Sequence, residues 1–490
     1  MLFNSWHFFV FFIIITTTYF LIPHKYRWFL LLASSCWFYM AFVPIYILIL
    51  GFTIVVDYFA GLYLEKTEGR IQKFFFIVGL AVNILILAAF KYYNFINNNI
   101  TAMLSGFHVQ NPFPVLTILL PIGLSFHTFQ AMSYIIEVYR GEQKAEHNFG
   151  IYALYVMFYP QLVAGPIERP QNLLHQFYEE HHFDYKRVTD GLKLMAWGLF
   201  KKAVIADRVA SFVSYVYDKP YEQHGFSLLI ATFMFAFQIF CDFSGYSDMA
   251  IGAAQVMGFD LMKNFNRPYH SRSVTEFWRR WHISLSTWLL DYVFKPMQMG
   301  MRYYGLMGNI LTILVTFLIS GIWHGANWTF VIWGGLQGLY LIIGLLTKPV
   351  RAKMVSFIRL DKFPKVYHAV QVAVTFSLIT FSWIFFRAKN VSEAFYIVKT
   401  IAMGFVDGLY DLVHRIPLGL ELRIPGSTII IATLAIALME TVHVMQNKYT
   451  IREWIRTKPL YFRWLTYYSL IMLILLFGVF EDQQFIYFQF

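Results

Sequence analysis

The chain has 490 residues, of which 58% are hydrophobic, 20% aromatic and only 14% charged, and its mean hydropathy is +0.53. A soluble domain carries about 25% charged residues, so this composition excludes a soluble protein and predicts a polytopic membrane protein. The net charge of +11 does not indicate nucleic-acid binding, because the basic residues stand in short segments beside apolar runs, as in inner-membrane proteins.

Apolar runs long enough to cross the hydrocarbon core recur along the whole sequence. They predict an all-α polytopic membrane protein with roughly 11 to 13 transmembrane or re-entrant helices. The first run, Trp6 to Leu21, lacks the basic flank and cleavage site of a secretory signal, and the run Trp28 to Met40 follows at once. It is therefore expected to be the first span of a single integral-membrane domain, residues 1–490.

Basic residues predict which loops face the cytoplasm, because short cytoplasmic loops are enriched in lysine and arginine. The segment 94–114 and the chain after Arg463 contain none, so both termini are predicted to lie outside a bacterial inner membrane. The residues assigned to the inside are Lys25, Arg27, Lys66, Arg70, Lys73, Arg140, Lys144, Lys186, Arg187, Lys193, Lys201, Lys202, Lys348, Arg351, Lys353, Arg359, Lys362, Lys365, Lys448, Arg452, Arg456, Lys458 and Arg463.

Cysteine and histidine usage predicts no metal site. Cys36 and Cys241 are far apart in apolar runs, so neither a disulfide framework nor a thiolate zinc site is expected. His175, His181 and His182 are close in sequence, but their spacing matches no metal-binding pattern, and a solvated loop is the better interpretation.

The middle of the chain, approximately residues 159–345, is expected to hold the functional site. From Tyr159 to Tyr304, charges, prolines and glycines interrupt the apolar runs, as they do where irregular backbone lines a cavity rather than lipid.

A first group of candidates lies between Gln238 and Gly252. Gln238, Asp242 and Tyr246 repeat every four residues and would form a polar stripe on a helix. Serines and glycines in this segment need only mediate helix contacts. Asp242, by contrast, is expected to pair with a buried arginine or to orient a histidine.

A second group lies between Ser273 and Tyr292. At helical spacing Arg279, His282 and Ser286 share one face, and Glu276 can pair with Arg279 or Arg280 one turn on. The opposite face is apolar and comprises Trp278, Trp281, Leu285 and Trp288. An interfacial helix with an aromatic belt would explain these tryptophans, but it leaves His282 unexplained. The two arginines would bind either donor phosphates or lipid headgroups.

A third candidate is His324, at a polar break between two apolar runs. An intramembrane histidine indicates a functional site, although a histidine at the wet end of a helical hairpin needs no chemistry. No nucleophile elbow, H-E-x-x-H or phosphate-loop pattern occurs, and neither His282 nor His324 is followed four residues on by aspartate. A lone imidazole can still act as a general base toward a hydroxyl.

Taken together, these motifs resemble the membrane-bound O-acyltransferase family, and more closely its subgroup of alginate O-acetyltransferases and their relatives in peptidoglycan and other envelope-polysaccharide acetylation. Nearly the whole chain takes part, and the two histidines are 42 positions apart. The segments that carry the resemblance are PIGLSFHTFQAMSYIIEVYRG (121–141), LVAGPIERP (162–170), FKKAVIADRVA (200–210), DFSGYSDMAIG (242–252), WRRWHISLSTW (278–288), GIWHGANW (321–328) and FIYFQF (485–490).

The resemblance implies helices around a central funnel or tunnel, with His324 as the catalytic residue and His282 as the second signature position. It implies no bound cofactor, acetyl-CoA as a cytoplasmic co-substrate, a periplasmic SGNH-hydrolase-like acetyltransferase as partner and a polysaccharide as acceptor. Residues expected to bind substrate or donor are Arg279, Arg280, Asp242, Tyr246, Ser286, Trp323 and Asn327.

One segment departs from the family pattern. Members often carry a glycine-rich turn with Asn-Arg soon after an Asp-Tyr pair, whereas this chain reads DYVFKPMQMGMRYYG from Asp291 to Gly305. Because this segment is bulkier and rich in methionine, the alginate substrate does not transfer directly.

The sequence therefore predicts a membrane O-acyltransferase that moves acetyl groups across the inner membrane for O-acetylation of an envelope polysaccharide. Alternatives within the class are peptidoglycan O-acetylation and D-alanyl transfer to teichoic acid. The alternative from another class is a transporter of polysaccharide or lipid-linked sugar, for which the polar stripes would form the substrate path. Such transporters often contain two related halves, and no internal repeat is evident in this sequence.

Overall fold

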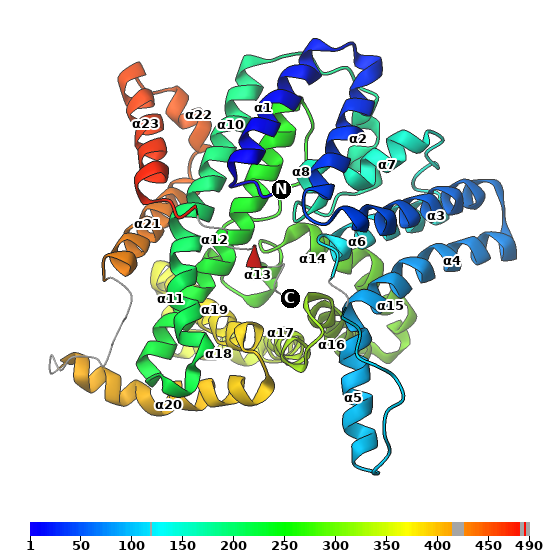
Figure 1. Cartoon of the computed structure of the whole chain (residues 1–490). Helices are drawn as coiled ribbons and strands as arrows, with labels where there is room; N and C mark the ends of the chain where they lie inside the picture. Colours follow the sequence, from blue (N-terminus) through cyan, green and yellow to red (C-terminus); the bar gives the residue numbers. More distant parts are fainter. Residues whose placement is uncertain (118–119, 414–425, 481–484, 487–490) are drawn as a thin grey trace. The chain divides into compact units, whose positions relative to one another are not determined.

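The computed structural model describes residues 1–490 except 118–119, 414–425, 481–484 and 487–490. In this described part the chain forms helices joined by loops and contains no strand (Figure 1). The all-α prediction is thus confirmed. The last four residues of the predicted outward C-terminus lie outside the described residues.

Eight helical stretches within the described residues are long and apolar enough to cross a membrane. They are Pro44–Lys66, Gly69–Ser105, Gly225–Met257, Arg302–His324, Trp328–Leu346, Pro364–Arg387, Thr428–Met445 and Leu460–Phe477. The predicted opening helix is present as α1, Trp6–Leu21, but its 16 residues span only about 24 Å against a hydrocarbon core of about 30 Å. The 11 to 13 helices predicted from the sequence included re-entrant ones. Helices too short to cross a membrane do occur between Tyr159 and Gly300.

The described residues group into two compact units that interleave along the chain. Unit 1 comprises residues 1–197 and 246–263, and unit 2 comprises residues 198–245 and 264–490. Helices assigned mainly to unit 1 are α1, α2 (His24–Met40), α3 (Ile47–Lys66), α4 (Gly69–Leu87), α5 (Tyr93–Ser105), α6 (Leu124–Arg140), α7 (Phe149–Met157), α8 (Tyr159–Leu162), α9 (Pro170–Leu173) and α10 (Tyr185–Leu199). The boundary falls inside the long helix α12 (Gly225–Met257).

Unit 2 contains the remaining helices and two π-helical segments, η4 (Phe200–Ala206) and η7 (Leu290–Phe294). These helices are one that precedes α12, three short ones that follow it, and mostly longer ones after those. They are α11 (Asp207–Asp218), α13 (Val274–Trp278), α14 (Ile283–Leu289), α15 (Lys295–Gly300), α16 (Gly305–His324), α17 (Trp328–Leu346), α18 (Lys348–Phe357), α19 (Pro364–Arg387), α20 (Val391–Val413), α21 (Gly426–Met445), α22 (Ile451–Arg456) and α23 (Leu460–Phe477).

Unit 1 joins α3 to α4 through a buried polar contact. The side-chain amide of Asn83 donates to both carboxylate oxygens of Asp57, at 2.8 and 3.0 Å, and also to the carbonyl of Gly79. Both side chains are fully buried. Such hydrogen bonds fix the pairing of apolar helices, because apolar faces alone do not select a partner in lipid.

In unit 2, α16 and α17 form a close helical pair, and the turn that connects them follows directly after His324. A Cβ on Gly321 would lie 2.3 Å from the carbonyl oxygen of Phe330, and one on Gly334 would lie 2.3 Å from that of Phe317. Only glycine permits this approach, as is common where membrane helices cross. The crossing positions the end of α16, and therefore His324, against α17.

A chain of hydrogen bonds ties α13 to this pair. The Trp278 indole donates to the side-chain oxygen of Gln337 on α17, at 3.2 Å, and the amide nitrogen of Gln337 donates to the Ser382 hydroxyl on α19, at 2.7 Å. Gln337 and Ser382 are completely buried. Three helices that are distant in sequence are thereby fixed around one polar link.

Unit 2 is organised around a buried lysine, Lys202, on the π-helical segment η4. Its ammonium lies 2.6 Å from Asp207 and 2.7 Å from Asp242, and all three side chains are nearly inaccessible. The second oxygen of Asp242 accepts the backbone N–H of Ile486, at 2.8 Å. Two carboxylates thus share one ammonium, and the network reaches from α12 to the end of the described chain.

This network corrects two expectations from the sequence. Asp242 pairs with a lysine rather than with an arginine or a histidine. Lys201 and Lys202 were assigned to a cytoplasmic loop, but both are buried, and Lys201 donates to Ser244 at 2.9 Å. Buried, paired lysines carry no information about membrane sidedness, because the orientation rule applies to loop charges.

Charge sharing sets the pKa of Asp207. Burial raises it, the Lys202 ammonium opposes this, and the nearby Asp242 carboxylate raises it further, so the pKa of Asp207 reaches about 7. One ammonium cannot fully stabilise two buried carboxylates.

Replacing Lys202 with methionine, which keeps the volume but removes the charge, should destabilise the protein by about 3–5 kcal/mol. Two buried carboxylates would then lose their cation. The measurement is thermal unfolding of purified protein in detergent. The matched control is Lys295→Met, because Lys295 lies at the same 2.7 Å from Asp291 but both side chains are at least one-third exposed. That change should cost less than about 1 kcal/mol, and equal losses in both variants would contradict the expectation.

Candidate functional site

All candidate residues named from the sequence belong to unit 2 except Tyr246, which belongs to unit 1. Tyr246 is buried there and its ring packs 4.5 Å from that of Phe3. The site is therefore built from unit 2 alone. Its two histidines come from the start of α14 and the end of α16.

His282 interrupts what the sequence predicted to be one helix. It adopts the left-handed conformation, with φ 43° and ψ 55°, and separates α13 from α14. A residue with a Cβ rarely adopts this conformation, so surrounding contacts must hold it there. The helical-face argument that grouped Arg279, His282 and Ser286 is wrong for this reason.

Asn264 provides those contacts. Its backbone carbonyl accepts the N–H of Ile283 at 2.9 Å, and its side-chain oxygen accepts the hydroxyl of Ser284 at 2.9 Å and the backbone N–H of Ser284 at 3.3 Å. The same oxygen lies 3.1 Å from Nδ1 of His282. The segment that begins at Asn264 thus runs beside the break and stabilises it.

This arrangement fixes the tautomer of His282. Because the backbone N–H of Ser284 points at the side-chain atom of Asn264, that atom must be the acceptor oxygen. Nδ1 of His282 therefore carries the proton and donates to it, which leaves the lone pair on Nε2. Burial lowers the pKa of His282 to about 3, so the ring is neutral near pH 7.

His324 is the last residue of α16 and is 4% exposed. Aromatic rings surround it: Trp333 lies at 5.0 Å, Phe386 at 5.3 Å and Trp323 at 4.9 Å, measured between ring centroids and with steep interplanar angles. The wet end of a hairpin, which was the alternative interpretation, does not describe a ring enclosed in this way.

Trp323 connects the two histidines. Its ring centroid lies 6.0 Å from that of His282 and 4.9 Å from that of His324. The Phe243 ring contacts the His282 ring edge-on, with 4.6 Å between the ring centroids. Two imidazoles 42 positions apart thus pack against one indole in an apolar surrounding.

The tryptophans of the second motif are buried in protein. Trp281 is 1% exposed and Trp288 3% exposed, and Trp281 packs 5.2 Å from Trp383 of α19. An aromatic belt at the membrane surface requires exposed rings, so this alternative does not account for them.

Arg279 and Arg280 differ in their surroundings. Arg280 pairs with Glu276 at 2.6 Å, which confirms one of the two predicted pairings. Arg279 is exposed. The positive charge of Arg279 is consequently the one that is more available to an external anion.

Two other candidates hold the backbone in place. The Ser286 hydroxyl donates to the carbonyl of Trp281, at 3.1 Å. Asn327 caps α17 by accepting the N–H of Thr329, at 3.0 Å, and its amide donates to the carbonyl of Lys389. Their suggested contact with substrate remains a prediction.

Sequence reasoning did not identify Asn264, Trp333 or Phe386. Asn264 lies 18 positions before His282, in a segment without a motif, and the two rings occur in apolar runs that contain many aromatic residues. The only local signal was the serine two residues after His282, which shares its acceptor.

Comparisons with known proteins give a consistent picture. The family model described as MBOAT, membrane-bound O-acyltransferase family, matches residues 140–388, which include both histidines. The chain is 38% identical over 378 residues to the protein named "Probable alginate O-acetylase AlgI" of Pseudomonas aeruginosa, which covers 77% of this chain and 70% of that protein.

Two further relatives carry other names. The peptidoglycan O-acetyltransferase of Helicobacter pylori is 34% identical over 396 residues, covering 75% of this chain and 72% of that protein. The teichoic acid D-alanyltransferase of Streptococcus thermophilus is 30% identical over 233 residues, covering 45% of this chain and 56% of that protein.

The buried state of His282 predicts a pH dependence of stability. Its pKa falls from 6.5 to about 3 on folding, so between these values the unfolded chain binds a proton that the folded chain does not. Stability should fall as pH decreases below 6.5, and His282→Gln should reduce that slope by up to about 1.4 kcal/mol per pH unit. Thermal unfolding in detergent between pH 7 and about 4 measures it. The exposed control His368→Gln should keep the wild-type slope; identical slopes for wild type and His282→Gln would refute the expectation.

Proposed function

The chain belongs to the membrane-bound O-acyltransferase family, and we propose that it moves an acetyl group from cytoplasmic acetyl-CoA across the inner membrane for O-acetylation of a cell-envelope polysaccharide. The observation that carries this proposal is the packing of His282 and His324 against one indole, that of Trp323. An O-acyltransferase needs a neutral base near the reacting hydroxyl, and a transporter does not. The transporter alternative is accordingly set aside.

His324 acts as the general base in this proposal. Its imidazole takes the proton from the acceptor hydroxyl while the hydroxyl oxygen attacks the thioester carbonyl. The C–S bond then breaks, and the departing thiolate receives the proton from the imidazolium. The rings of Trp333 and Phe386 pack against this imidazole and hold it in place.

His282 supports the same site with a neutral ring whose orientation Asn264 sets. Arg279 contacts the donor's phosphates, since its charge is exposed, whereas Arg280 is shared with Glu276. The acyl group is released on the outer side to a periplasmic SGNH-hydrolase-like acetyltransferase, which passes it to the polymer. Support for acetyl as the group moved comes from the names of the relatives, alginate O-acetylase and peptidoglycan O-acetyltransferase.

Peptidoglycan is the second candidate acceptor. The Helicobacter pylori relative named for it is 34% identical over a similar share of the chain as the alginate relative. D-alanyl transfer is less well supported, because the relative with that name matches only 45% of this chain.

His324→Ala should reduce acetylation of the envelope polymer to the level of a strain that lacks the protein, because general-base catalysis contributes about 10²–10⁴-fold in rate. The amount of protein in the membrane should stay near wild type. Acetate released from purified polymer by mild alkali gives the measurement, and His368→Ala is the control. His282→Ala should leave a residual activity. Unchanged acetate content in the His324 variant would show that the base lies elsewhere.

Donor and acceptor should be used from opposite sides of the membrane. Purified protein is inserted into sealed vesicles, and labelled acetyl-CoA is added only at the face that carries the segment Lys348–Lys365. We expect label to reach a hydroxyl acceptor or purified partner placed only at the other face. Transfer that occurs only when both are in one compartment would identify a same-side acyltransferase instead.

A further inference from the structure

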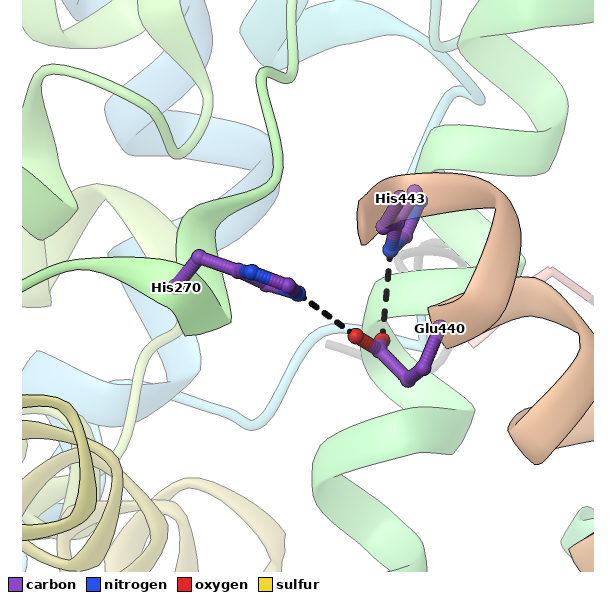
Figure 2. Close-up of side chains that lie close together, drawn as sticks. All are labelled: His270, Glu440 and His443. Carbon is purple, nitrogen blue, oxygen red and sulfur yellow. Dashed lines mark hydrogen bonds and ion pairs between the residues drawn. The ribbon is translucent and has the colours of Figure 1, made fainter. Parts of the chain in front are cut away.

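Unit 2 contains a second group of chemically active side chains, His270, Glu440 and His443, outside the site described above (Figure 2). Nε2 of His270 lies 2.7 Å from one oxygen of the Glu440 carboxylate, and Nδ1 of His443 lies 3.2 Å from the other. All the ligand atoms lie within 4.8 Å of one another. Figure 2 shows both rings directed at the same carboxylate.

The group joins two segments that are 170 positions apart. Glu440 and His443 occupy neighbouring turns near the end of α21, whereas His270 ends the short helical turn Pro268–His270 before α13. No metal site was predicted from the sequence, because local spacing cannot reveal ligands brought together by folding.

Independent contacts hold the turn of His270 in place. The Tyr269 hydroxyl donates to the carbonyl of Ala236 on α12, at 2.6 Å. The Arg267 guanidinium donates to the side-chain oxygen of Asn447, two positions after α21 ends. The buried contact of Tyr269 and the surface contact of Arg267 thus hold the backbone on both sides of the three side chains.

The ligand set suits a particular class of metal. Two imidazole nitrogens and one carboxylate form a borderline set that binds zinc and similar transition metals, and such three-residue sets leave a coordination position for water. His443 is 7% exposed at its side chain, while His270 and Glu440 are 25% and 29% exposed. One side of the group is thus enclosed and the other can receive water.

Hydrogen bonds without a metal ion could also hold these side chains together. In that case Nε2 of His270 and Nδ1 of His443 would both carry hydrogens that they donate to Glu440. A metal requires the opposite tautomers, with lone pairs on these two nitrogens. Glu440 lies in a helix that is long and apolar enough to span a membrane. A carboxylate there needs a partner, which is either a hydrogen-bond donor or a metal ion.

We infer that His270, Glu440 and His443 bind one divalent transition metal of the zinc class, with water completing its coordination. A metal with ligands at about 2.0–2.2 Å would hold the ligand atoms about 3.3–3.6 Å apart, so the 2.7 Å contact between His270 and Glu440 would lengthen to admit the ion. It would fasten the end of α21 to the segment that begins at Asn264. That segment also orients His282, so the metal would stabilise the loop on which the acyltransferase site depends.

The test uses the full chain, expressed with added zinc, purified in detergent and passed into metal-free buffer. Mass spectrometry of the metal content should find about one zinc per chain. Protein stripped with a chelator and refilled with Co²⁺ should develop visible absorption bands typical of a nitrogen- and oxygen-bound ion. Added zinc should raise the unfolding temperature of the stripped protein.

Glu440→Gln keeps the shape of the side chain but removes the charge and replaces one acceptor oxygen with an amide NH2, and it should lose most of the zinc and the Co²⁺ bands. The matched control is His147→Asn, because His147 and Glu65 form a similar pair at 2.8 Å. Its zinc content should match wild type.

Two results would overturn the inference. Wild-type protein that carries no more zinc than Glu440→Gln would mean that protons alone hold the three side chains. Equal loss of zinc in the His147→Asn control would mean that the ion binds non-specifically.

Discussion

One ammonium group in an apolar interior constrains much of unit 2. Lys202 is buried with Asp207 and Asp242, and a buried ion is tolerated only when its partners are fixed around it. Each partner lies on a different element: Asp207 opens α11, and Asp242 lies in the middle of α12. Meeting this electrostatic requirement therefore determines how η4, α11 and α12 pack, and α12 also carries Phe243, which lies beside His282.

The histidine site depends on the opposite kind of surroundings. Both His282 and His324 pack against aromatic side chains, and Asn264 fixes the proton on Nδ1 of His282. The lysine network holds paired charges, whereas the contacts described for the two imidazoles are with aromatic rings and the amide of Asn264.

Much of this could be predicted from the sequence, and the failures have clear causes. Apolar runs gave the helical class and the bounds of α1, and the break at His324 was visible because polar residues interrupt two runs. The left-handed break at His282 was not, since histidine adopts that conformation more often than most residues but still too rarely to predict it at one position. Asn264 and the cluster at Glu440 were missed because they depend on contacts between distant segments, which no spacing rule describes.

The contact between Asp242 and Ile486 also has a consequence for how the protein is made. These residues are 244 positions apart, and at about 5–20 residues per second a ribosome needs roughly 12–50 s to synthesise the intervening chain. During that interval the Lys202 ammonium can already bind one oxygen of the Asp242 carboxylate, but the backbone donor of the other oxygen has not yet been made. The buried network is therefore completed only late in synthesis.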